Sequence, residues 1–185
     1  MNDQVTLLRD GIPLGIWLLL ALIAVATIAA VLATVLRSGP GNEKTLRFTS
    51  GILSVLGLLV AGYVVYKTQI LNEVPQCVGG GGGCTLVERS DYSELAGVHV
   101  SIFGFIGYAL ILAATVIRDD RARVAAFVLS FFGFGFSVYL TYLELYDIKA
   151  ICQWCVASAV LMTMLFVVNT IRALSYYGLD EEPDS

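Results

Sequence analysis

The chain has 185 residues, of which 57% are hydrophobic and 14% are charged, and its formal net charge is −4. A mean hydropathy of +0.80 lies well above that of a soluble domain, so the composition indicates an integral membrane protein. The negative charge argues against a nucleic-acid partner.

Several apolar runs are long enough to cross a bilayer, since a spanning helix needs about 20 apolar residues. They cover residues 12–36, 50–69, 98–117, 124–146 and 152–171. Within lipid these runs must be helical, because an open sheet would leave backbone polar groups unpaired. The sequence therefore predicts an all-α polytopic membrane protein.

The first run could instead be a cleaved signal peptide. It is longer than a typical signal core, however, and Asp3 and Asp10 accompany its single leading arginine, Arg9, which favours a retained span. At the other end, the acidic segment that finishes the chain is expected to be solvated and disordered.

The orientation follows from the basic residues, which favour the cytoplasmic ends of spans. Seven of the eleven Lys and Arg residues fall on one side, and they are Arg37, Lys44, Arg47, Arg118, Arg121, Arg123 and Arg172. This side is predicted to be cytoplasmic, with the C-terminus, and the protein is expected in the cytoplasmic membrane. The loop over residues 70–97 and the turn around Lys149 are then extracytoplasmic.

All four cysteines of the chain fall on that outer side, where disulfides can form and persist. Cys152 and Cys155 open the last apolar run with a spacing that places both on one helical face, close enough for a disulfide. The first turn of a helix favours negative charge and so a reactive thiolate. A redox pair is predicted here, and a structural disulfide or half of a metal site are the alternatives.

The second pair, Cys77 and Cys84, flanks a run of glycines from 79 to 83 on the same side of the membrane. Glycines have wide backbone freedom, so this loop is expected to be mobile. The loop pair could meet a soluble partner and then pass electrons to the fixed pair through mixed disulfides. After the loop, Ser90 begins a loose helix-capping pattern that predicts a short surface helix over 90–95.

Together these motifs resemble the vitamin K epoxide reductase (VKOR) family in its bacterial branch. The features are the loop cysteine pair, Ser90 six residues after Cys84, the glycine- and aromatic-rich stretch VSIFGFIGY at 100–108, and CQWC at 152–155. They extend over about residues 50–171, and their ordered combination is far more specific than any one motif.

The resemblance implies a four-helix bundle around a quinone, preceded by one extra N-terminal transmembrane helix. It divides the chain into residues 1–48 with the extra helix, a catalytic unit over 49–172 and a tail over 173–185. Cys152 and Cys155 would be the active pair, with Cys155 attacking the quinone. Cys77 and Cys84 would be the shuttle, and Ser90 would lie near the quinone head group.

The same resemblance implies the reaction and its partners. The electron acceptor would be ubiquinone or menaquinone, no metal would be needed, and the electron donor would be a separate thioredoxin-fold dithiol protein that oxidises exported proteins. Val100 and Ala159 stand where vertebrate members have an asparagine and a tyrosine, so the resemblance extends to quinone reduction rather than to epoxide chemistry.

Two rival functions remain open at this point. The disulfide bond formation protein B family is also quinone-linked, but its CxxC pair precedes its wider pair, the reverse of the order here. A non-enzymatic membrane protein with purely structural disulfides is the other.

Residues near the cysteines have simpler interpretations. His99 is expected to pack at the interface, Trp154 to anchor the last span, and Glu144 to lie near the membrane surface without relaying protons. Some of the aromatic residues between 103 and 139 are expected to line a quinone pocket, and most to face lipid or other helices.

Overall fold

The computed structural model describes residues 43–77, 82–95 and 97–177 of the chain. Within them lie four long helices, which are α3 (Glu43–Val65), α5 (Val100–Val116), α6 (Asp120–Leu143) and α7 (Gln153–Tyr177). The predicted first span, the glycines at 79–81 and the acidic tail lie outside the described residues. Within the described residues, the chain is therefore helical where its apolar runs predict it.

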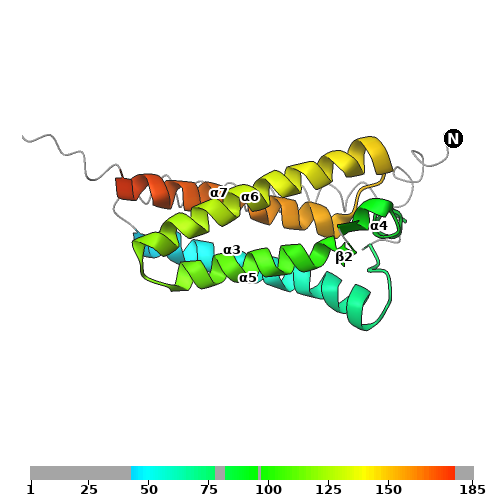
Figure 1. Cartoon of the computed structure of the whole chain (residues 1–185), viewed down its shortest axis with the longest axis horizontal. Helices are drawn as coiled ribbons and strands as arrows, with labels where there is room; N and C mark the ends of the chain where they lie inside the picture. Colours follow the sequence, from blue (N-terminus) through cyan, green and yellow to red (C-terminus); the bar gives the residue numbers. More distant parts are fainter. Residues whose placement is uncertain (1–42, 78–81, 96, 178–185) are drawn as a thin grey trace, which may run out of the picture.

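The four helices form a ring. Helix α3 packs on α5 and α7, and α6 packs on the same two helices from the other side (Figure 1). The core between them contains aliphatic side chains, two methionines and Tyr108, which is fully buried. Gly57 allows this arrangement, because a Cβ at that position would overlap the Tyr108 ring.

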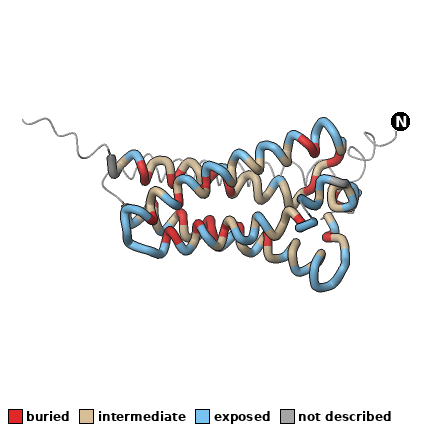
Figure 2. The backbone as a smooth tube through the Cα atoms, viewed as in Figure 1, coloured by how far each residue is buried: buried red, intermediate tan, exposed pale blue. Residues whose placement is uncertain are grey.

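The outward surface of the ring is apolar. Large hydrophobic side chains such as Phe48, Leu59 and Phe132 are at least 65% exposed, while buried positions face the inside of the ring (Figure 2). A soluble protein would rarely expose so much apolar surface. Helices α3, α6 and α7, with their terminal turns, are long and apolar enough to cross a membrane, so this is a membrane protein.

Helix α5 has 17 residues and is shorter than the predicted span 98–117. Its first residues are lost to a hairpin, in which strand β1 (Glu94–Leu95) pairs antiparallel with β2 (Val98–His99). Gly97 provides the positive φ of +78° in the tight turn between them. His99 then caps α5 by accepting a hydrogen bond from the Ser101 backbone N–H.

The other spans are longer than the hydropathy predicts, because two of them continue into π-helical turns. Helix α3 extends through η1 (Tyr66–Ile70) and α6 through η3 (Glu144–Ile148), and α7 continues past residue 171 to Tyr177. The turn η3 ends at Lys149, whose φ of 55° reverses the chain towards α7. This reversal brings residues 150–152 back against the end of α6.

The outer loop carries a helix that the sequence did not predict, α4 (Gly83–Glu88), followed by one 3₁₀ turn, η2 (Asp91–Ser93). The short helix expected over 90–95 is confined to η2. Ser90 occupies the capping position, but its hydroxyl donates to the Val87 carbonyl at 2.6 Å instead of capping η2. Figure 1 shows α4 and β2 together at the end of the ring where α7 begins.

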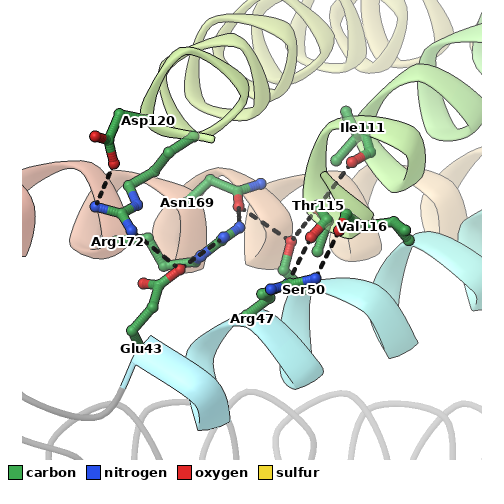
Figure 3. A network of polar contacts seen from close by, with 10 residues as sticks. Glu43, Arg47, Ser50, Ile111, Thr115, Val116, Asp120, Asn169 and Arg172 are labelled. Atoms are coloured by element: carbon green, nitrogen blue, oxygen red, sulfur yellow. Dashed lines mark hydrogen bonds and ion pairs between the residues drawn. The ribbon is translucent and has the colours of Figure 1, made fainter. Parts of the chain in front are cut away.

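A polar network joins the four long helices at the opposite end of the ring (Figure 3). The guanidinium of Arg172, on α7 and only 3% exposed, lies 3.0 Å from Glu43 on α3 and donates to Asn169 at 3.1 Å. Ser50 donates to the same Asn169 oxygen and also contacts Thr115 on α5. Arg123 on α6 contacts Glu43 at 3.6 Å, so the network connects α3, α5, α6 and α7.

Replacing Glu43 by alanine is expected to destabilise the protein by about 3 kcal/mol, because it leaves the buried Arg172 without its carboxylate. Reversible unfolding in mixed detergent micelles measures this loss. The matched control is Glu73→Ala, which removes a solvent-exposed partner of Lys67 and should change nothing measurable. Equal losses in the free energy of unfolding for Glu43→Ala and Glu73→Ala would contradict the stabilising role of the Glu43–Arg172 ion pair.

Candidate functional site

The loop cysteines form a disulfide. Cys77, in the segment after η1, is bonded to Cys84 in α4, and their Cα atoms are 5.6 Å apart. Cys84 is 1% exposed, and its backbone N–H donates to the Cys77 sulfur at 3.2 Å. The sequence predicts that these two residues act as a pair, and in the structure they are bonded to each other.

Cys152 and Cys155 are both free thiols at the start of α7. The carbonyl of Cys152 accepts the first hydrogen bond of the helix, from Val156 at 3.0 Å, so Cys152 lies at the helix cap and Cys155 in the first turn. Cys152 is 4% exposed and Cys155 is half-buried. The structure therefore shows the loop pair oxidised and the helix pair reduced.

Two contacts tie the loop to the start of α7. The indole N–H of Trp154, between the two free thiols, donates to the Gln76 carbonyl at 3.2 Å. Gly83 lies so close to the Ile151 carbonyl that a Cβ at residue 83 would overlap it. Trp154 also packs its ring on Tyr63, with centroids 4.6 Å apart. Trp154 thus joins the two cysteine segments, a role beyond the anchor that the sequence predicted.

The free pair lies on the wall of a cavity of about 150 Å³ enclosed by the four helices and the outer loop. Three of the aromatic residues proposed for a pocket line it, namely Phe103, Tyr108 and Phe136. The other five have different surroundings: Phe134 packs on Phe166, and the exposed ones are Phe105, Phe131, Phe132 and Tyr139. Both free cysteines and Ser90 also line the cavity.

The surface of the cavity is mostly apolar, and polar groups occupy a minor part of it. Tyr108 donates to the Ser158 carbonyl at 2.8 Å and lies 3.1 Å from the Ser158 hydroxyl. His99 is buried, and its Nε2 contacts the Glu88 carboxylate, so it links α4 to the start of α5 as a structural residue. Cavities with apolar walls and a few polar groups are typical of sites for small organic molecules.

Glu144 is the site residue that sequence reasoning missed. It is only 4% exposed and lines the cavity beside the free pair. Its carboxylate accepts a hydrogen bond from the Cys152 backbone N–H at 3.2 Å and another from the Cys155 thiol. The sequence did not predict this burial, which arises because the turn at Lys149 folds residues 150–152 over Glu144.

The electrostatics of Cys152 favour a thiolate. The pKa of Cys152 lies below the ordinary value for a thiol, chiefly because the Cys155 thiol donates a hydrogen bond to its sulfur. Backbone N–H groups of the first turn act in the same direction, whereas burial and the nearby Glu144 charge oppose it. Cys152 is thus prepared for thiol–disulfide exchange.

Alkylation of the reduced protein tests this shift. Because the pKa of Cys152 is lowered, its thiolate should persist to a lower pH than the thiolate of an ordinary cysteine. The rate of its alkylation by iodoacetamide should therefore decline at a lower pH as well. In the Cys155→Ala variant the donor is lost while burial and Glu144 remain, so the midpoint should rise. Site-resolved mass spectrometry measures both profiles, and identical midpoints would contradict the assigned cause.

The sequence profile of the Vitamin K epoxide reductase family matches residues 48–170. The match covers most of α3 and of α7, all of α4, α5 and α6, the four cysteines and every residue of the cavity wall named above. Members of this family are oxidoreductases that act on thiols and disulfides in membranes. This chain belongs to the Vitamin K epoxide reductase family and is a membrane thiol–disulfide oxidoreductase.

Proposed function

We propose that the protein oxidises a separate extracytoplasmic thioredoxin-fold dithiol protein and passes the electrons to a membrane quinone, ubiquinone or menaquinone. Electrons move from the partner to Cys77 and Cys84, from there to Cys152 and Cys155, and then to the quinone. The partner, once oxidised, introduces disulfides into exported proteins. Residues 49–172 act as the catalytic unit, a four-helix bundle of the family type preceded by one further span within 1–48, with a tail over 173–185.

One observation carries the proposal: a reduced cysteine pair lies on the wall of an apolar cavity, and an oxidised pair is held at the same end of the helices. Disulfides that only stabilised structure would not require a reduced pair beside a cavity. In this direction a loop thiolate attacks the Cys152–Cys155 disulfide at Cys152, and closure of the Cys77–Cys84 disulfide then expels Cys152. The lowered pKa of Cys152 supports this step, because a thiol of low pKa is a good leaving group.

The cavity also supports a quinone as the substrate. Flat aromatic rings pack well against its apolar and aromatic walls, and the Tyr108 and Ser158 hydroxyls, which contact each other, are polar groups on that wall that could turn to a quinone oxygen. Cys155 is the less buried of the two free thiols and is proposed to face the quinone. Ser90 is proposed to help hold the head group.

The distribution of the basic residues supports an orientation with the cysteine end of the helices outside the membrane and the Glu43–Arg172 end at the cytoplasm. This orientation gives the loop pair access to a water-soluble dithiol and the helix pair access to a lipid-soluble oxidant.

The direct test is a coupled assay with the purified protein, a reduced thioredoxin-fold protein and a short-chain quinone. Loss of quinone absorbance should require both the protein and the dithiol, with one quinone reduced for each dithiol oxidised. A protein whose cysteines serve structure alone would leave the quinone unchanged.

A further inference from the structure

Glu144 is a carboxylate in an unusual position. It closes the outer end of α6 at the first residue of a π-helical turn, and such turns are frequent at functional sites. Its side chain is almost completely buried, although it belongs to the segment where the spanning helix ends.

The contacts of the Glu144 carboxylate concern the free cysteine pair. The Glu144 backbone carbonyl accepts from Ala150 N–H at 3.1 Å, and its carboxylate accepts from Cys152 N–H and from the Cys155 thiol. The Cys155 proton therefore has two acceptors within reach, the Cys152 sulfur and the Glu144 carboxylate.

A purely structural role does not account for the charge. Burying a carboxylate is costly unless a cation offsets it, and no cation is paired with Glu144 among the residues that the structure describes. Its charge also opposes the Cys152 thiolate. A glutamine side chain could accept the same hydrogen bond from the Cys152 backbone N–H, but only a carboxylate can take up a proton.

We propose that Glu144 is the proton acceptor for Cys155 when the pair is oxidised. This proposal rests on the proposed quinone reduction. The Cys155 S–H bond breaks and its proton moves to Glu144, the S–S bond to Cys152 forms, and the electron pair passes to the quinone. The two protons released by Cys152 and Cys155, the latter by way of Glu144, end on the two oxygens of the quinol, so Glu144 regains its charge.

The test is single-turnover quinone reduction by fully reduced protein, followed from pH 6 to pH 10 in wild type and Glu144→Gln. Glutamine keeps the size and the acceptor for Cys152 N–H but takes no proton. At pH 7 the rate should fall about 100-fold, as is usual when a general base is removed. The deficit should shrink as pH rises, because solvent then deprotonates Cys155 without help.

The matched control is Asp147→Asn, which changes a carboxylate to an amide in the same π turn. Asp147 is exposed and accepts a hydrogen bond from Tyr92, which asparagine can also accept, so this variant should keep the wild-type profile. The other titratable groups on the cavity wall are unchanged in both variants, and they are Glu88, Tyr92, His99, Tyr108, Cys152 and Cys155.

A wild-type rate of quinone reduction in Glu144→Gln would overturn the proposal. A rate lowered by the same factor at every pH would also overturn it, because misplaced thiols, and not a missing proton acceptor, produce that result. If Glu144→Gln does not assemble with an intact Cys77–Cys84 disulfide, Glu144→Asp replaces it. The shorter acid should show the same pH-dependent deficit to a smaller degree. Failure of the wild type itself to reduce quinone would instead refute the proposed function.

Discussion

Replacing Cys155 by alanine is expected to abolish quinone reduction, with a loss on the order of 10⁴-fold or more, as when an essential nucleophile is removed. Cys155 is the half-buried thiol on the cavity wall, and without it the helix pair cannot form a disulfide. Loss of quinone absorbance under turnover with a reduced thioredoxin-fold protein measures the effect. The control Val156→Ala changes the neighbouring exposed side chain and should retain the wild-type rate.

Removing Cys77 together with Cys155 should trap an intermediate. Oxidation of this double variant with diamide joins Cys84 to Cys152, and neither resolving thiol remains to release them, so the mixed disulfide between Cys152 and Cys84 should accumulate. Peptide mapping under non-reducing conditions detects this link. Quinone reduction at the wild-type rate in Cys155→Ala would refute the assigned chemistry.

Replacing Cys84 by alanine is expected to separate the two halves of the electron path. Turnover driven by the thioredoxin-fold protein should be lost completely, because the loop pair can no longer carry a disulfide. Turnover driven by a high concentration of a small dithiol should remain, because such a molecule can reduce the Cys152–Cys155 disulfide directly. Quinone absorbance with each donor gives the two rates.

Thr85→Ala is the control, since it alters the next residue of α4 and leaves the disulfide intact. Partner-driven turnover that survives in Cys84→Ala would show that the partner bypasses the loop pair. Loss of turnover with both donors would show that Cys84 serves the quinone step itself.

The spans were predictable because lipid leaves the backbone few choices. An apolar run of sufficient length must be helical, and α3, α5, α6 and α7 appear where such runs occur. Their ends were less predictable. Polar residues such as Lys67 and Glu144 lower the local hydropathy, yet the backbone continues through π turns beside them. At α5 the hairpin at residues 94–99 removed the first residues instead.

The cysteines were predictable because their spacing carries chemical information. Their surroundings were not, because these depend on contacts between distant segments. Glu144 near the end of an apolar run is indistinguishable by sequence from a solvated surface residue. Its burial follows from the left-handed turn at Lys149 and the close approach of Gly83 to Ile151. Helix α4 escaped prediction because it is short and begins inside a glycine run.

The most direct test of the electron path counts electrons without any partner. The fully reduced protein, with all four cysteines as thiols, is mixed with excess short-chain quinone, and the quinol formed is measured together with the disulfides. Formation of both disulfides should yield two quinols for each protein molecule. The Cys77→Ala/Cys84→Ala variant retains only Cys152 and Cys155 and should yield one. Formation of the Cys77–Cys84 disulfide with no quinol produced would contradict the path from the loop pair through Cys152 and Cys155 to the quinone.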